Sequence, residues 1–365
     1  MKYYFVVGEA SGDIHAANLI SEIKKVDSWA EFRGFGGDRM KKAGVQLTKT
    51  LSDLAFMGFV EVLANLRAIL GNLTACKDDI LEFEPDKLVL VDYPGFNIRL
   101  AKWAKEKGVE VTYYISPQIW AWKEGRVHTI KKVVDRMMVI LPFEKAFYAK
   151  HQMDVDFVGH PLIDEIAQWR EENPEVSKSE KVVVLMPGSR EHEISKVLPV
   201  MLKAAKQFPE RRFVIGKAGH IPMRFYQKFK LNGVEVSEEG SYALLGKADA
   251  ALVTSGTATL ETGLFHVPQV VCYKGNAISV QMARRLIKVK YISLVNLILG
   301  RVSVPELIQS ELNVEKLTVH LKELLTDSEF RKKQLSDYRE LEKLLGSTGA
   351  SKRAAELIVS QTSVD

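Results

Sequence analysis

Residues 248–261 read Ala-Asp-Ala-Ala-Leu-Val-Thr-Ser-Gly-Thr-Ala-Thr-Leu-Glu, and this stretch decides how the chain is interpreted. The apolar run at 248–253 predicts a buried parallel strand, and the pattern from Thr259 predicts a helix. The small residues between them direct free N–H groups and the helix dipole at one point, which suits a phosphate group. Glu261 follows one turn later, where its carboxylate could accept hydrogen bonds from a ribose diol. An ordinary helix cap is the alternative, and this motif alone does not decide between the two.

The composition narrows the functional classes. The chain has 365 residues, 46% of them hydrophobic and 27% charged, as in ordinary soluble proteins. The net charge of +5 comes from dispersed Lys and Arg, so we expect no nucleic-acid partner, although acidic substrates or anionic lipids would be favoured. No stretch approaches the roughly 18 apolar residues that span a bilayer, so any membrane contact should be peripheral. Cys76 and Cys272 lie far apart without metal-ligand spacing, which indicates reduced cytosolic thiols. No set of His, Asp, Glu and Cys has metal-ligand spacing, so no metal is implied, and we expect no cofactor.

Strand and helix patterns alternate through both halves of the chain. The predicted strands are short apolar runs, most of which end in turns of small or polar residues, at 3–7, 87–91, 109–115, 136–141, 156–158, 181–186, 212–216, 234–236, 248–253 and 269–273. Helical patterns between them, such as 14–25 and 194–207, indicate parallel α/β sheets. The segment 32–38 is interpreted as a glycine-rich turn after a weak strand.

A polar, aperiodic stretch at 168–180 is predicted to link two domains. The expected domains are 1–167 and 181–340, followed by a helical tail at 341–365 that packs on the first domain of its own chain or of a partner in a homodimer. Two such domains facing a cleft would both direct their strand C-termini toward it, where ligands of open α/β sheets bind.

Polar residues follow several predicted strands. In Pro187-Gly188-Ser189-Arg190, Gly188 allows close approach of an anion, Ser189 can donate to it, and Arg190 can bind phosphate oxygens with its planar fork. A simple turn is the alternative, but the 254–261 turn in the same predicted domain favours a diphosphate site. A Walker-A lysine motif is missing, so hydrolysis of a nucleoside triphosphate is not supported.

The first half carries a candidate base. Asp92 ends a buried strand before Pro94, where its carboxylate could deprotonate a hydroxyl or simply stabilise a turn. The loop with Ser116, Gln118, Trp120 and Trp122 offers hydrogen-bond donors, although both tryptophans could be structural. His15 and His160 are each interpreted as structural histidines beside turns.

Residues 57–73 predict a helix with more apolar positions than one narrow face needs. A core-facing helix is the simplest reading, and an exposed apolar patch for a partner or a membrane is the other. The candidate lipid contacts are its large apolar side chains, Met57, Phe59, Val62, Leu63, Leu66, Ile69 and Leu70, with Arg67 reaching toward head groups.

Together these segments resemble the lipid-A-disaccharide synthase family. The resemblance rests on nine motifs in the family's order, which begin at Gly8, Gly36, Met57, Val91, Ile115, Leu141, Val158, Pro187 and Ser255 and read GEASGD, GGD, MGFVEV, VDYPGFN, ISPQIWAW, LPFEKAF, VGHPL, PGSRE and SGTATLE. It covers nearly the whole chain. It implies a GT-B glycosyltransferase fold with two Rossmann-like domains.

The resemblance also implies a reaction. A 2,3-diacylglucosamine unit passes with inversion from its UDP conjugate to 2,3-diacylglucosamine 1-phosphate (lipid X), giving a β-1,6-linked disaccharide 1-phosphate and UDP without a metal. The enzyme would work in the cytoplasm, peripherally on the inner face of the inner membrane of a Gram-negative cell. Another UDP-sugar enzyme on the same frame, such as an epimerase, is the alternative.

Residue roles are carried over by matching motifs. Asp92 would be the base, and Arg190 would stabilise the departing UDP. The UDP site would comprise Gly188, Ser189, Arg190, Ser255, Gly256, Thr257, Ala258, Glu261, Asn296 and Gln309, and the acceptor site Ser11, Gly12, Asp13, Ser116, Gln118 and Trp120. Val295 stands where many relatives carry proline, which leaves the backbone beside Asn296 less defined by the resemblance.

Overall fold

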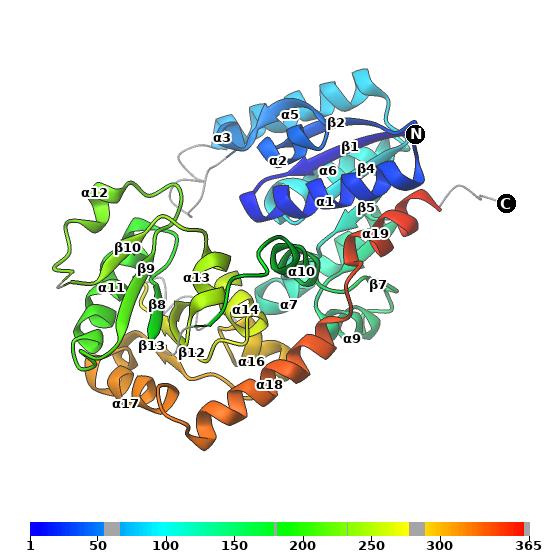
Figure 1. Ribbon diagram of the computed structural model, residues 1–365. Coiled ribbons are helices and arrows are strands. Elements are labelled where there is room, and N and C mark those ends of the chain that lie inside the picture. Colours follow the sequence, from blue (N-terminus) through cyan, green and yellow to red (C-terminus); the bar gives the residue numbers. More distant parts are fainter. Residues whose placement is uncertain (55–65, 179–180, 232, 277–288, 361–365) are drawn as a thin grey trace. The chain divides into compact units, whose positions relative to one another are not determined.

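The computed structural model describes residues 1–54, 66–178, 181–231, 233–276 and 289–360 (Figure 1). They form two compact units, Met1–Asp164 with Gly346–Asp365, and Glu165–Leu345. The predicted linker at 168–180 differs from this division, because its first part belongs to helix α10, Leu162–Glu172. The ring of Trp169 packs on Phe265 with centroids 5.4 Å apart, so apolar packing extends the helix into the polar run.

The first unit is built on a seven-stranded parallel sheet in the order β3-β2-β1-β4-β5-β6-β7. Its strands are β1 (Lys2–Val7), β2 (Glu31–Gly36), β3 (Gln46–Thr50), β4 (Lys87–Val91), β5 (Glu110–Tyr114), β6 (Arg136–Val139) and β7 (Asp156–Phe157). The central strands are buried on both faces, as near-continuous apolar runs require. β1 lies between β2 and β4, with Val7 opposite Val91, so their following turns leave the same edge.

Helices cover both faces of this sheet (Figure 1). They are α1 (Ala10–Val26), α2 (Asp38–Lys42), α3 (Leu51–Leu54), α5 (Leu66–Phe83), α6 (Pro94–Glu106), α7 (Ile119–Trp122), η1 (Glu124–Arg126), α8 (Val127–Val133), α9 (Pro142–Lys150) and α19 (Ala350–Val359). Tyr4 and Val6 share an apolar cluster with α5, α6 and α8. The helix predicted at 57–73 starts outside the described residues, and its described part, α5, continues to Phe83.

The predicted glycine-rich turn at 32–38 is wrong for most of its length, because Glu31–Gly36 forms β2. Gly34 explains why: its φ is +154°, and a Cβ there would lie 2.0 Å from the carbonyl oxygen of Phe5 on β1. The glycine therefore allows two backbones to approach within a sheet rather than reverse the chain.

The C-terminal helix α19 completes the first unit by packing on α1. Two cations hold its last turn to the sheet: Lys87 Nζ donates to the carbonyl of Ile358 at 2.8 Å, and Arg136 Nη1 donates to that of Leu357 at 3.1 Å. Lys87 is 1% exposed and also pairs with Glu110 at 3.1 Å. These contacts satisfy free carbonyls at the negative end of the helix.

The second unit has a six-stranded parallel sheet in the order β10-β9-β8-β11-β12-β13. Its strands are β8 (Val182–Met186), β9 (Arg212–Gly216), β10 (Glu235–Ser237), β11 (Ala250–Thr254), β12 (Gln269–Tyr273) and β13 (Glu306–Ile308). Its helices are α11 (Glu191–Ala205), α12 (Met223–Tyr226), α13 (Ser241–Lys247), α14 (Thr257–Leu264), α16 (Leu294–Leu299), η2 (Gln309–Glu311), α17 (Val314–Leu324) and α18 (Glu329–Leu345). The predicted α/β class with two parallel-sheet domains is thus confirmed.

Candidate active site

In the second unit, two glycine-containing turns lie side by side at the carboxyl edge of the sheet. β8 and β11 are adjacent and parallel, with Met186 opposite Val253, so the 187–190 and 254–258 turns leave the same edge. A Cβ placed on Gly188 would lie 3.6 Å from Cγ2 of Thr254. This edge is where open α/β sheets bind their ligands.

The 187–190 turn presents a cation before helix α11. Gly188 has a φ of +117°, and an added Cβ would lie 3.0 Å from Oε2 of Glu193. Arg190 caps the N-terminus of α11, with its side chain 55% exposed and its Nη1 3.2 Å from Oε1 of Glu193. Ser189 is exposed beside it. The turn therefore offers a guanidinium and a hydroxyl that can bind phosphate oxygens.

The 254–258 turn presents the N-terminus of helix α14. Gly256 caps this helix with a φ of +149° and is exposed together with Thr257, whereas Ser255 and Ala258 are partly exposed. Ser255 Oγ donates to the carbonyl of Ile292 at 2.7 Å, so this hydroxyl anchors the turn. The first amides of α14 remain directed at the edge, where they can bind an anion.

Glu261 lies one turn along α14 and is partly exposed. Its charge contributes, after burial, to raising the pKa of Tyr242, which locates the carboxylate near that phenol. At the other side of the sheet, Gln309 follows β13 with a φ of +57°, and its Oε1 accepts from the amide of Gly275 at 2.9 Å. Through this hydrogen bond Gln309 links the turn after β12 to the turn after β13.

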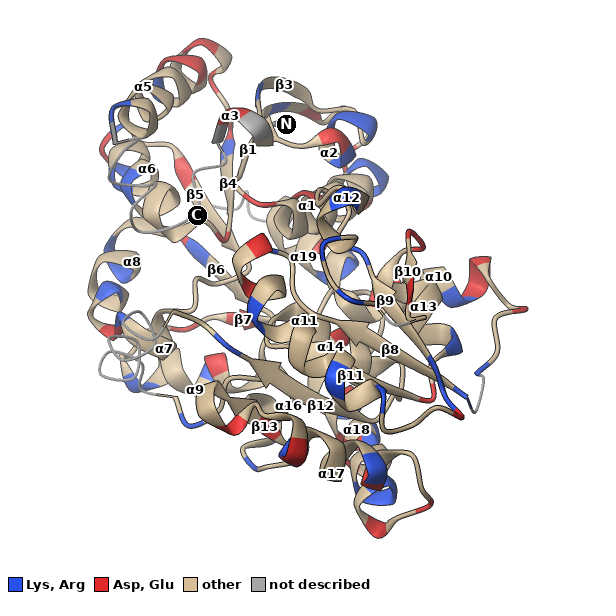
Figure 2. Cartoon of the chain, turned by 90° about the vertical axis from the view of Figure 1, so that its left-hand side faces the viewer, with Lys and Arg blue, Asp and Glu red and all other residues tan. Residues whose placement is uncertain are grey.

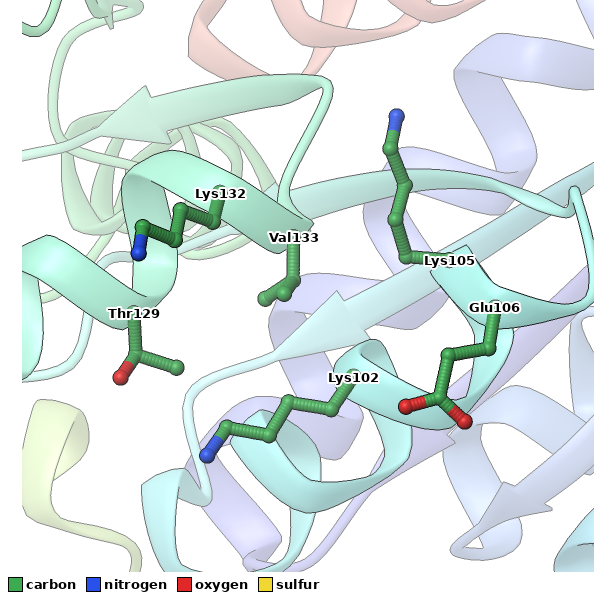
Figure 3. A pocket seen from close by; sticks show the side chains of 6 residues that line it. All are labelled: Lys102, Lys105, Glu106, Thr129, Lys132 and Val133. Atoms are coloured by element: carbon green, nitrogen blue, oxygen red, sulfur yellow. The ribbon is translucent and has the colours of Figure 1, made fainter.

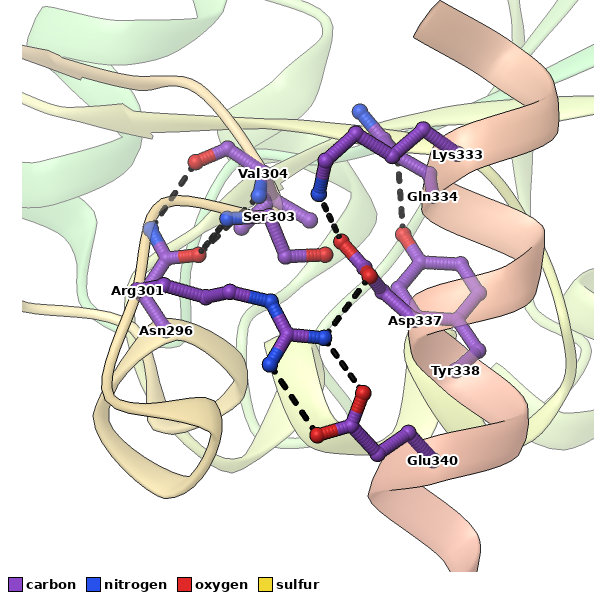
Figure 4. Close-up of polar contacts among 9 residues, drawn as sticks. All are labelled: Asn296, Arg301, Ser303, Val304, Lys333, Gln334, Asp337, Tyr338 and Glu340. Carbon is purple, nitrogen blue, oxygen red and sulfur yellow. Dashed lines mark hydrogen bonds and ion pairs between the residues drawn. The ribbon is translucent and has the colours of Figure 1, made fainter.

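Asn296, which the resemblance assigns to the UDP site, has its polar atoms bonded within the fold. It is fully buried, and its Oδ1 accepts from the amides of Ser303 at 2.7 Å and Val304 at 3.0 Å (Figure 4). Its Nδ2 donates to Glu306 at 2.8 Å and to the carbonyl of Val304 at 2.9 Å. An amide with these bonds stabilises the loop whose Ile292 carbonyl accepts from Ser255.

In the first unit, Asp92 occupies a constrained turn at the end of β4. Asp92 and Tyr93 have φ angles of 44° and 47°, in the left-handed region that non-glycine residues seldom adopt. Asn97 Nδ2 donates to the Asp92 carbonyl at 2.8 Å, and the hydroxyl of Tyr113 donates to the same oxygen. Both contacts fix the backbone, so the strained turn holds the carboxylate at the sheet edge.

The surroundings of Asp92 suit a base. The residue is partly exposed, yet burial of its carboxyl group, and then the nearby Glu9 carboxylate, raise its pKa from 3.8 to about 7. A base with a pKa near the working pH combines an adequate ionised fraction with a useful proton affinity. Glu9, which the sequence did not single out, caps α1 after β1 and is exposed. Its position after the strand next to β4 is the signal that could have identified it.

The predicted acceptor residues divide into exposed and structural groups. Ser11 and Gln118 are exposed, whereas Gly12 is buried, with a Cβ there only 2.9 Å from Cγ1 of Val7. Asp13 is 4% exposed, and its carboxylate accepts from three amides of the 37–40 segment, at 2.8, 3.0 and 3.1 Å. That carboxylate caps α2, so its oxygens are occupied by the fold.

The polar atoms of Ser116 and Trp120 also point inward. Ser116 Oγ lies 2.7 Å from the hydroxyl of Tyr148, and Trp120 Nε1 donates to Glu144 Oε1 at 3.1 Å. Burial raises the pKa of Glu144 to about 7, although several donors partly offset the rise. These contacts hold the 116–122 segment, and they leave Gln118 and the 46%-exposed Trp122 as its outward side chains.

The predicted lipid-contact residues fall partly within the described residues. Met57, Phe59, Val62 and Leu63 lie outside the described residues, and Leu66 begins α5 without a described side chain. Ile69 packs against the apolar cluster of the first unit, whereas Leu70 is 46% exposed. Leu70 is therefore the one member of this set whose exposure the structure establishes.

A cavity of about 450 Å³ lies between α6 and α8, away from the Asp92 turn (Figure 3). Its lining consists of Lys102, Lys105, Glu106, Thr129, Lys132 and Val133. The residues of α6 that line the cavity lie at the C-terminal end of the helix, whereas Pro94 begins it next to the Asp92 turn. The cavity therefore lies at the edge of the sheet opposite that turn.

Two further observations concern the described residues only. None of their helices combines the length and apolar character that crossing a bilayer requires. No group of three or more of their His, Cys, Asp or Glu side chains is placed to bind a metal ion.

The comparisons with known proteins cover almost the whole chain. Residues 3–360 match the family described as lipid-A-disaccharide synthetase. A lipid-A-disaccharide synthase of Syntrophus aciditrophicus is 41% identical over 363 residues, 96% of this chain and 95% of the relative. A lipid-A-disaccharide synthase of Nitrosococcus oceani is 43% identical over 366 residues, which cover 97% of this chain and 94% of the relative.

Solved structures show the same architecture at low identity. UDP-GlcNAc 2-epimerase from Neisseria meningitidis, bound to UDP-GlcNAc, has a TM-score of 0.69 at 15% identity and covers 99% of this chain and 100% of its own. The glycotransferase of kitacinnamycin has a TM-score of 0.69 at 17% identity, covering 99% of both chains. This likeness establishes the GT-B fold, and the sequence match establishes the family. The chain therefore belongs to the lipid-A-disaccharide synthase family of GT-B glycosyltransferases.

Proposed function

We propose that the enzyme transfers 2,3-diacylglucosamine from its UDP conjugate to the 6-hydroxyl of 2,3-diacylglucosamine 1-phosphate, with inversion, and releases UDP. Two observations support the proposal, each within its own unit: a base-like carboxylate in the first unit and a strand edge suited to binding an anion in the second. A sugar transfer that starts from a nucleotide conjugate needs both.

The donor side is proposed at the carboxyl edge of the second sheet. Arg190, Ser189 and the first amides of α14 would bind the diphosphate, with Gly188 keeping the space beside them free of a side chain. Glu261 would accept hydrogen bonds from the ribose. Gln309 would support the neighbouring turn, and Asn296 would act indirectly through the 292–306 loop.

The proposed chemical step would use residues of both units. Asp92 would remove the proton from the acceptor hydroxyl as its oxygen bonds to the anomeric carbon and the bond from that carbon to UDP breaks. Negative charge then grows on the departing diphosphate, where the Arg190 guanidinium and the amides stabilise it without rearranging. Glu9 would keep the pKa of Asp92 high enough for this role.

Lipid contact is proposed for the start of α5, at the inner face of the inner membrane. Leu70 is exposed there, and burying an exposed leucine in acyl chains is favourable by roughly 2 kcal/mol. A Leu70→Glu variant should sediment less with lipid vesicles. Val319→Glu on α17, where the residue is 55% exposed, serves as the matched control. Equal loss in both variants, or in neither, would remove the proposed contact.

UDP release measured with and without the acceptor tests the reaction. We expect release from UDP-2,3-diacylglucosamine only when 2,3-diacylglucosamine 1-phosphate is present, with a disaccharide 1-phosphate as the second product. Several solved structures with this fold are UDP-GlcNAc 2-epimerases, so isomerised UDP-sugar without an acceptor is the contrary outcome.

A further inference from the structure

We infer that Arg99, Lys123 and Arg126 form a phosphomonoester site beside Asp92, which receives the phosphate of the sugar acceptor. Arg99 lies in the second turn of α6, Lys123 separates α7 from η1, and Arg126 ends η1 where α8 begins. The inference rests on the proposed function, since it names what binds the acceptor's charged end.

Two of the cations make cation–π contacts with an exposed aromatic ring. The Lys123 ammonium lies 4.2 Å from the centre of the Trp122 ring, and the Arg126 guanidinium lies 5.7 Å from it. The ring attracts both cations through its quadrupole and restricts where they can go. Trp122 itself is 46% exposed, so ligands can reach this group from solvent.

These cations lack acidic partners in the part of the chain that the structure describes. No carboxylate lies within ion-pair distance of Arg99, Lys123 or Arg126 among those residues, and the intervening Glu124 is instead 3.2 Å from His151. By contrast, Lys105 on the same helix α6 as Arg99 pairs with Asp135.

The three cations lie close enough for the positive charge of one to lower the pKa of another. Burial, and next the Arg126 charge, lower the pKa of Lys123, while burial and the Arg99 charge lower that of Arg126. Each ammonium or guanidinium would therefore be stabilised by a nearby anion. A phosphomonoester carries close to two negative charges at pH 7 and so suits this cluster better than the single charge of a phosphodiester.

The cluster belongs to the catalytic edge. Tyr113, whose hydroxyl donates to the Asp92 carbonyl, has its pKa raised by burial and by Asp92 and lowered by Arg126, so it lies within the influence of both. Figure 2 shows Lys and Arg positions on both α6 and α8, but those that line the cavity of Figure 3 lie farther along these helices. Lys102 and Lys132 of that cavity are consequently matched controls.

The test compares the phosphorylated acceptor with its dephosphorylated analogue. In Arg126→Gln we expect KM for 2,3-diacylglucosamine 1-phosphate to rise about 10-fold to 100-fold, as the loss of one charged hydrogen bond to phosphate predicts. KM for the UDP-sugar and kcat/KM for the analogue should stay within about twofold. Lys123→Gln should behave alike, and Lys102→Gln and Lys132→Gln should match wild type.

The outcomes separate the two proposals. Absence of acceptor-dependent UDP release in wild type would overturn the reaction. An active wild type whose preference for the phosphorylated acceptor is unchanged in Arg126→Gln would overturn the phosphate site alone. Sedimentation with vesicles of anionic phospholipid distinguishes a bilayer source: we expect equal binding of both proteins, and reduced binding of Arg126→Gln with unchanged acceptor preference would contradict the inference.

Discussion

Replacing Asp92 with asparagine should stabilise the folded protein while abolishing sugar transfer. Burial and Glu9 raise the pKa of this carboxyl group from 3.8 to about 7, so ionising it costs the folded state about 4 kcal/mol more than it costs the unfolded chain. Asparagine stays neutral and tolerates the left-handed backbone that a φ of 44° demands. It cannot, however, accept the proton of the attacking hydroxyl.

The sign of the pH dependence follows from linkage. Between pH 3.8 and about 7, the folded state keeps a proton that the unfolded state has released, so wild-type stability falls as the pH rises through this window. The Asn variant has no ionisable group at this position, so its stability does not fall in this way. Its free energy of unfolding should equal that of wild type below about pH 4, exceed it by about 1.5 kcal/mol at pH 5, and exceed it by at most about 4 kcal/mol at pH 8.

Urea denaturation at pH 5 and pH 8, with UDP release measured on the same samples, checks both halves of the prediction. Asp78→Asn, at an exposed position of α5, controls for the loss of a carboxylate in general. The reasoning fails if the Asp92 variant gains the same stability at both pH values, or if it retains transfer near the wild-type rate.

Three further outcomes are expected. Wild-type kcat/KM should rise about tenfold between pH 6 and pH 8 with a midpoint near 7, as the ionised fraction of Asp92 does; a flat profile would argue against this base. Gly188→Ala should weaken UDP binding measured by calorimetry, because a Cβ there is strained and lies 3.0 Å from a carboxylate oxygen, whereas Gly219→Ala, with no atom within 4 Å, should bind normally. Lys87→Met should lower the free energy of unfolding by about 1–3 kcal/mol, since the carbonyl of Ile358 loses its 2.8 Å donor; an unchanged melting curve would show that α19 does not depend on it.

Sequence periodicity predicted most of the apolar strands but missed strands that lack an apolar run. The strands at 87–91, 212–216 and 269–273 have the predicted bounds, because each is an apolar run that ends at a turn. Two edge strands went unrecognised. β3 reads Gln-Leu-Thr-Lys-Thr, with alternating exposed residues, and β13 has three residues, so neither forms an apolar run.

The site shows a similar limit. Motifs identified the turns that hold Asp92 and Arg190, because a strand, a small-residue turn and a helix leave a local pattern in sequence. The direction in which a side chain points leaves no such pattern. Asp13 and Asn296 match family motifs, yet their side-chain oxygens accept hydrogen bonds from backbone amides. Glu9 and Arg126 stand out only when adjacent elements are placed in space.

The docking of α19 on α1 has a consequence for synthesis of the protein. The first unit contains Met1–Asp164, but the helix that covers one side of α1 comes from Gly346–Asp365, which is translated after the whole second unit. A nascent chain would therefore carry an uncovered apolar strip while the entire second unit emerges from the ribosome. That interval exposes it to chaperones or to aggregation, and truncating the last helix would make the exposure permanent.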